Sequence, residues 1–232
     1  MIAVNASTEG HERYIGNIIT VWRSATEEQL LRGRSWYRTA HEMASLIAGG
    51  DVRAGAGVVA ALSANTSWPE TLRLARRAFE TGVPSGHLPD ALAKATSIMS
   101  GRDPRHVLPL ERKTGQFFRC IFDPDDPDAV VIDRHAHDVA VGETYGKRDR
   151  GLGSARRYAL LARCYREAAV RLGELPSTVQ AVTWVVHTDR ARSAEVLGHR
   201  GQSSRPQRTV PEVVTGDASV LHCAAHRVLV TR

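Results

Sequence analysis

Leu108-Pro109-Leu110-Glu111-Arg112-Lys113-Thr114-Gly115 opens the most informative part of this chain, which continues twenty residues after the lysine as Val130-Val131-Ile132-Asp133-Arg134-His135. Asp133 follows an apolar run and precedes a predicted helix, which is the position of an N-cap residue. Lys113 carries an amine that becomes nucleophilic when it loses its proton, and a carboxylate can take that proton. The two stretches therefore predict an amine and carboxylate pair, for which capping by Asp133 and a solvated helix lysine are the alternatives.

Apolar residues recur three and four positions apart along most of the chain, which is the spacing of one helix face. Pro176 favours a helix start before the last predicted segment, although β-branched residues in that segment also suit a strand. The predicted helices are two between Glu12 and Ala48, one capped by Asp51 and ending at Leu62, one opened by a capping box of Ser67 and Glu70, and then Asp90 to Met99, Leu110 to Ile121, Ser154 to Leu172 and Thr178 to Thr188. This pattern predicts an all-α fold.

The chain has 232 residues, a formal net charge of +6 and a pI near 9.6. We expect a helical domain over residues 1–188, formed as one lobe or two, and a basic arm with a small C-terminal element over residues 189–232. The basic surplus fits a polyanionic partner, and ordinary solvated faces are the alternative. Nucleic acid is the polyanion that this charge favours.

Cysteine usage and hydropathy set the expected compartment. Cys120, Cys164 and Cys223 are far apart and lack the close spacing of zinc or iron-sulfur ligands. His135 and His137 are two positions apart and point to different helix faces, so we expect no metal and no cofactor. We also expect no export signal and no membrane anchor, and therefore a cytoplasmic protein.

The residues around Lys113 and Asp133 resemble the helix-hairpin-helix DNA glycosylases. In that superfamily a hairpin ends in a turn similar to Arg112-Lys113-Thr114, which carries an amine nucleophile, and the next apolar segment ends in a catalytic aspartate. The resemblance implies a glycosylase-like fold, with Lys113 as nucleophile and Asp133 as the aspartate. It departs from the superfamily at Leu110-Glu111, where the hairpin lacks the glycines that let backbone amides approach a phosphate.

A second resemblance is to a phage branch of the same superfamily. Three segments carry it: Ala61 to Trp68, Lys113 to Phe117 and Ile132 to His135. Some members of that branch are associated with thymine hypermodification, in which an amine displaces an activated group on the methyl carbon of the base. The resemblance implies a base pocket that works without cleaving the bond to the sugar.

Three functions remain open from the sequence. The first is a DNA-base-processing enzyme that flips a base out of the double helix and cleaves its N-glycosidic bond. The second is a transferase that installs an amine on an activated thymine in DNA. The third is a non-catalytic DNA-binding helical protein. The predicted site residues are Asp133 and Lys113 for catalysis, Asn65, Trp68, Gln180, Trp184, His135 and Arg134 for the substrate, and Arg112, Arg190, Arg192, Arg200 and Arg205 for DNA phosphates. Core packing for Trp184, an exposed helix position for Gln180 and a turn for Asn65 are the simpler alternatives.

Overall fold

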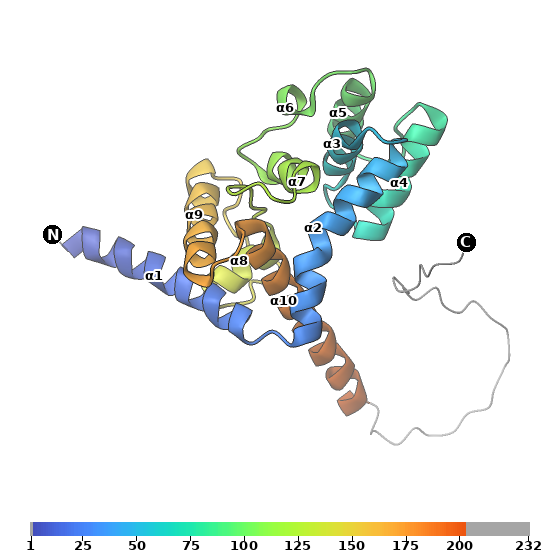
Figure 1. Ribbon diagram of the computed structural model, residues 1–232. Coiled ribbons are helices and arrows are strands. Elements are labelled where there is room, and N and C mark those ends of the chain that lie inside the picture. Colours follow the sequence, from blue (N-terminus) through green and yellow to red (C-terminus); the bar gives the residue numbers. More distant parts are fainter. Residues whose placement is uncertain (1, 203–232) are drawn as a thin grey trace, which may run out of the picture. The chain divides into compact units, whose positions relative to one another are not determined.

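A computed structural model describes the backbone of residues 2–202 and the side chains of residues 9–193. Within residues 2–202 the chain forms helices and no strand, so the fold is all-α, as predicted (Figure 1). The helices are α1 (Ile2–Arg23), α2 (Glu27–Ile47), α3 (Val52–Leu62), α4 (Trp68–Thr81), α5 (Pro89–Met99), α6 (Pro104–Val107), α7 (Lys113–Phe122), α8 (Arg134–Val141), α9 (Ala155–Leu172) and α10 (Pro176–Gln202).

Local signals set most helix ends. The Asp51 carboxylate accepts a hydrogen bond from the Ala54 amide at 3.0 Å and starts α3, as predicted. The capping box at the start of α4 was wrong, because the Ser67 side chain makes no capping bond and Glu70 binds Arg73 instead. The predicted helix from Leu110 begins later, at Lys113, because the residues before it form a turn.

The last described helix is longer than predicted. α10 continues past Thr188 to Gln202, so residues 189–202 of the predicted arm are helical. Asp189 holds this helix to α2, because its carboxylate accepts hydrogen bonds from Gln29 and Arg32. The compact unit ends at Glu195, and a second unit covers residues 196–232. The predicted C-terminal element over 210–232 lies outside the described residues.

Two hydrophobic cores form within residues 1–195. One is built from α3, α4, α5, α7 and part of α2, and the other from α1, α8, α9 and α10. Figure 1 shows α2 running from the second group of helices to the first. Gly33 allows α2 to cross α10 closely, since a Cβ at this position would overlap the backbone and side chain of Val182. These two groups of helices, here called lobes, share α2 within one compact unit.

One extended segment belongs to both cores. Residues 129–132 are fully buried, and successive side chains point to opposite sides, as in a strand. Ala129 and Val131 enter the first core, whereas Val130 and Ile132 enter the second. The segment ends at Asp133, so it places that residue at the junction of the two lobes.

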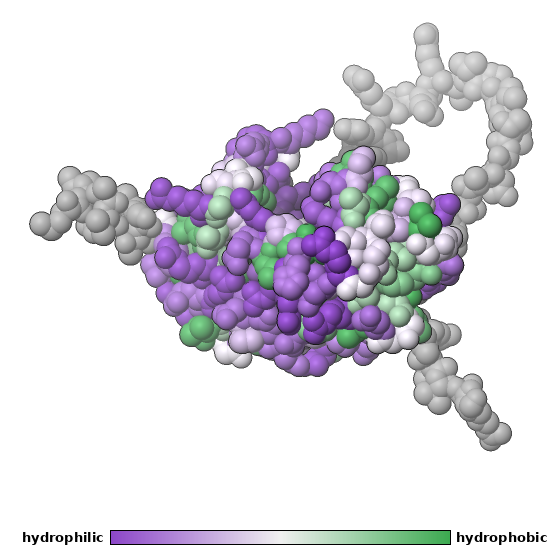
Figure 2. Space-filling model, turned by 90° about the horizontal axis from the view of Figure 1, so that it is seen from above, coloured by the Kyte–Doolittle hydropathy of each residue, from purple (hydrophilic) through white to green (hydrophobic). Residues whose placement is uncertain are grey.

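The surface is mainly polar on the face shown in Figure 2, where hydrophobic residues form separate small patches. Within the part of the chain that the structure describes, no single helix is long and apolar enough to cross a membrane. α2 and α3 reach the required length and apolarity only as a pair, across a bend of 107°.

Candidate active site

Lys113 is the first residue of α7, and a tight turn places it there. Gly115 lies against the backbone of Pro109 and Leu110, where a Cβ would overlap the Pro109 carbonyl and the Leu110 Cα. The buried Gln116 side chain donates to the Leu110 carbonyl at 2.7 Å and accepts from the Val130 amide at 3.0 Å. One glutamine therefore connects the turn before Lys113 to the segment that leads to Asp133.

Asp133 is the N-cap of α8, which confirms the predicted capping role. Its Oδ1 atom accepts both capping hydrogen bonds, from the His135 amide at 3.0 Å and from the Ala136 amide at 2.8 Å. The backbone before it is held by Tyr158, whose hydroxyl accepts from the Ile132 amide at 3.1 Å. Among the described residues Oδ2 makes no hydrogen bond, so the carboxylate caps the helix through one oxygen alone.

A pocket of about 150 Å³ lies beside Lys113 and Asp133. Its walls are mainly aromatic, with ring centroids of Trp36 and Trp68 5.1 Å apart and those of Trp36 and Phe117 5.9 Å apart. The residues that line it are Trp36, Tyr37, Ser63, Thr66, Trp68, Thr71, Lys113, Phe117, Val131, Asp133, Gln180, Ala181 and Trp184. This volume matches that of a cavity that accommodates one six-membered ring.

Gln180 is held in one orientation at the pocket wall. It is only 5% exposed, and the buried Tyr37 hydroxyl donates to its Oε1 atom at 2.8 Å. Burial raises the pKa of Tyr37 well above its usual value, so the hydroxyl keeps its proton. The Gln180 Nε2 atom makes no hydrogen bond to another described residue and is available to a carbonyl oxygen of a ligand. Gln180 is therefore a buried polar residue and not an exposed helix position.

The pocket opens into a larger cleft of about 1120 Å³. Ser63, Thr66, Trp68, Lys113, Asp133 and Trp184 line both spaces. The predicted residues Asn65, Arg112, Arg134, His135 and Arg192 line the cleft alone. Asn65 has a φ of 59° in the turn between α3 and α4, which confirms the alternative that it is a turn residue. The cleft thus gathers basic side chains around the pocket mouth.

Two histidines lie near Asp133. The rings of His135 and His187 are 5.3 Å apart, and His135 also contacts Trp184 edge-on at 5.9 Å. Burial lowers the pKa of His135, although the charge of Asp133 opposes this, and burial likewise lowers the pKa of His187. Both imidazoles are therefore mainly neutral at pH 7, and a neutral imidazole can donate one hydrogen bond and accept another.

A buried ionic cluster fixes the other half of α8. Asp138 accepts two hydrogen bonds from Arg150, at 2.8 and 2.7 Å, and pairs with His137 at 2.9 Å. Burial alone would raise the pKa of Asp138, but the hydrogen bonds from Arg150, His137 and the Tyr145 amide lower it to about 2. The cluster ties the loop over residues 142–153 to α8, and this loop brings Leu152 and Gly153 to the cleft.

Not every predicted site residue is at the site. Arg190 lines neither the pocket nor the cleft and donates to the Ser24 hydroxyl. Arg200 lies in α10 but in the second compact unit, and only its backbone is described; Arg205 lies outside the described residues.

Most of the aromatic wall was not among the predicted site residues. Trp36 and Tyr37 are adjacent in α2 and both line the pocket, and nothing in their local sequence distinguishes them from core residues. Phe117 is four residues after Lys113 and so lies on the same helix face, which could have been used.

The comparison with protein families matches residues 1–191 to DUF7178, a family of unknown function. The chain belongs to DUF7178. All pocket residues of this DUF7178 protein lie inside the matched region, and Arg192 of the cleft lies one residue beyond it. Neither the comparison with curated proteins nor the comparison with solved structures gave a match.

Proposed function

We propose that this protein binds DNA, takes up a base flipped out of the double helix, and cleaves its N-glycosidic bond. The observation that carries the proposal is the aromatic pocket of one-ring size whose rim holds both Lys113 and the free oxygen of Asp133. The sequence around Lys113 and Asp133 resembles the helix-hairpin-helix glycosylases, and this resemblance supports the same function. The glycosylase-like fold is part of the proposal.

The pocket fits a single-ring base. Aromatic side chains offer faces on which a flipped base stacks, and stacking contributes about 1 to 3 kcal/mol per base. The Gln180 amide nitrogen can donate to a base carbonyl oxygen, and Thr66 and Thr71 add hydroxyl groups beside Trp68. A pyrimidine is therefore the base class that the volume and polar groups favour.

Asp133 and Lys113 supply the chemistry in this proposal. Bond cleavage develops positive charge on the sugar, which a nearby carboxylate stabilises in a site that excludes water. Asp133 Oδ2 can fill that role, or it can accept a proton from an attacking water or amine. Lys113 can attack the sugar carbon as a neutral amine while the base leaves with the electrons of the broken bond, and the product rearranges to an imine.

The cleft around the pocket mouth supplies the phosphate contacts. Arg134 and Arg192 are exposed there, and Arg112 is half-buried because it donates to the Gly153 carbonyl at 3.1 Å. Glu111 is exposed on the turn before α7 and repels phosphate, so binding depends on the arginines more than on the turn. These contacts position the DNA without reading its sequence.

A transferase that installs an amine on an activated thymine is the second candidate. The one-ring pocket favours it as well, because thymine is a pyrimidine and the base would enter without loss of its sugar bond. In that reaction Asp133 would accept the proton of the incoming amine.

Mass spectrometry separates these functions. Double-stranded DNA from candidate phage and bacterial sources is incubated with wild-type protein and with Asp133→Asn, and released bases and nucleosides are measured. A free base that appears only with wild type supports cleavage, and an altered nucleoside supports the transferase. Unchanged DNA that still binds the protein would support the non-catalytic alternative, and DNA that does not bind would overturn the proposal.

A further inference from the structure

A second cavity is lined by Tyr37, which also lines the base pocket. It has a volume of about 240 Å³ and shares Tyr37, but no other lining residue, with that pocket. It shares no lining residue with the outer cleft. Because the cleft is the side on which DNA is proposed to bind, a DNA phosphate is not the natural occupant of this second cavity.

The cavity contains the first turn of α10. Pro176 begins this helix, and the Ser177 and Thr178 amides that follow make no backbone hydrogen bond within the described residues. Free amides at the start of a long helix, together with the helix dipole, favour an anion.

Ser177 provides an independent sign of a ligand. Its side chain is only 2% exposed and lines the cavity, yet its hydroxyl forms no hydrogen bond with any other described residue. The Ser177 oxygen is not fully buried, and the small surface that it exposes belongs to the cavity lining. A small molecule in the cavity would supply a hydrogen-bond partner.

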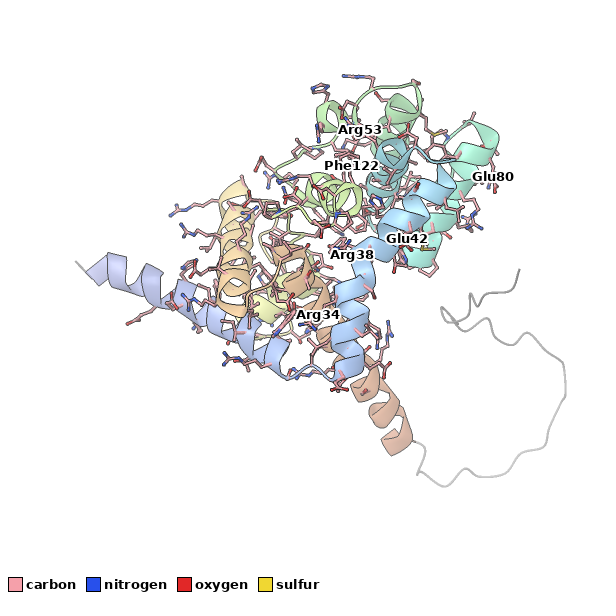
Figure 3. All side chains as sticks on the ribbon, viewed as in Figure 1. Arg34, Arg38, Glu42, Arg53, Glu80 and Phe122 are labelled. Atoms are coloured by element: carbon pink, nitrogen blue, oxygen red, sulfur yellow. The ribbon has the colours of Figure 1, made fainter. Side chains whose placement is uncertain are left out.

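Two arginines from α2 complete the lining. Arg34 and Arg38 are one turn apart on the same face of α2 and are both labelled in Figure 3. Arg34 pairs with Glu174 and Arg38 pairs with Asp125, in each case through a single Nη2 contact. Each guanidinium has five N–H groups, so donors remain for a ligand, and each acidic side chain is already neutralised by its arginine.

We propose that this cavity binds a small molecule through an oxyanion group, either a carboxylate or a phosphate. The Ser177 hydroxyl and the Ser177 and Thr178 amides donate to the oxyanion, and the remaining N–H groups of Arg34 and Arg38 add donors beside it. The site does not require the protein to act on DNA. Because Tyr37 lines this cavity and also holds Gln180, an occupant would touch the residue that orients the base pocket.

NMR titration of the full-length protein tests the site. Sodium phosphate and sodium acetate are added separately, with ionic strength held constant by sodium chloride, and the Ser177 and Thr178 amide resonances are followed. We expect saturable shifts at both amides. Ser177→Ala should raise the dissociation constant about tenfold, because it removes one hydrogen bond to a charged group. Ser35→Ala, on an exposed part of α2 outside the cavity, should leave it unchanged.

The two probes also identify the ligand class. Saturation by phosphate alone would indicate a phosphate ester, and saturation by acetate alone a carboxylic acid. Arg38→Gln is a second variant that should weaken binding without loss of the fold, since the Arg38 side chain is 63% exposed. Shifts that never saturate with either probe, or that are the same in Ser177→Ala as in wild type, would overturn the site.

Discussion

Replacement of Asp133 by asparagine separates its capping role from its proposed chemistry. Both capping amides donate to Oδ1, and asparagine keeps an oxygen there, while the free Oδ2 becomes an amide nitrogen. The cap is therefore preserved, and only the favourable interaction of a negative charge with the start of α8 is lost, at a cost of about 0.3 to 1 kcal/mol. For a domain of this size a loss of 1 kcal/mol lowers Tm by about 2 to 4 °C.

The expected effect on turnover is much larger. Removal of a general base or charge partner commonly lowers the rate by about 10² to 10⁴. The assay measures Tm by calorimetry, and turnover on the DNA whose base or nucleoside changes in the mass spectrometric experiment. Asp51→Asn is a matched control, because Asp51 caps α3 in the same way and lines neither the pocket nor the cleft. It should show a similar small change in Tm and full turnover.

Asp133→Ala completes the series. It removes the cap as well as the charge, so it should cost about 1 to 2 kcal/mol and lower Tm more than Asp133→Asn does. If Asp133→Asn folds normally and retains full turnover, Asp133 is a cap alone, and the assignment of the reaction to this pocket is wrong.

Four further predictions follow from the same structure. If Lys113 forms an imine, Lys113→Ala should abolish borohydride trapping of the protein on DNA. Lys94 pairs with Asp90 and does not line the pocket, so Lys94→Ala should be trapped like wild type. Trapping that persists in Lys113→Ala would assign the nucleophile to another residue. Gly115→Ala should lower the unfolding free energy by about 1 to 3 kcal/mol in denaturant titrations, because the new methyl group overlaps the Pro109 and Leu110 backbone. The control Gly16→Ala, which has open space around it in α1, should raise the unfolding free energy by about 0.5 to 1 kcal/mol. Equal effects of the two substitutions would contradict the close contact at Gly115. Asp138 has a pKa of about 2, below its ordinary value of 3.8, so its contribution to stability is fully present above pH 3.8 and is lost as the pH falls towards 2. Asp138→Asn should remove this acid dependence and lower the unfolding free energy by about 3 to 5 kcal/mol, because Arg150 loses its buried carboxylate. An acid unfolding curve that is the same in the variant and in wild type would rule the pair out as a stabilising contact. Removal of residues 196–232 should reduce both DNA affinity and its salt dependence if basic residues such as Arg200 and Arg205 contact phosphates, and identical salt slopes for the two proteins would exclude that contact.

Periodicity and local capping chemistry made much of the fold predictable. The helix predicted from Ser154 to Leu172 and the caps Asp51 and Asp133 depend on residues within one or two turns of each other, so a single sequence carries their full signal. The failed capping box at Ser67 shows the limit of that reasoning, because Glu70 had a second partner, Arg73, at an equally favourable helical spacing.

The candidate site was predictable only in part, because its walls come together from distant parts of the chain. Asp133 and Lys113 stand out through their neighbours in sequence, whereas the hydrogen bond from Tyr37 to Gln180 joins residues 143 positions apart. The aromatic wall likewise joins Trp36 of α2, Trp68 of α4 and Phe117 of α7. No local pattern reports that three such residues meet.

The segment over residues 129–132 has a consequence for how a ligand reaches the pocket. Its side chains pack alternately into the two cores, and its backbone amides donate hydrogen bonds to the Gln116 and Tyr158 side chains. A hinge motion of one lobe against the other would have to break these contacts and displace Asp133. Opening and closing of the lobes is therefore a costly way to admit a ligand. A base would instead enter a site that is already assembled before binding, and rate-limiting motion, where there is any, would belong to the nucleic acid.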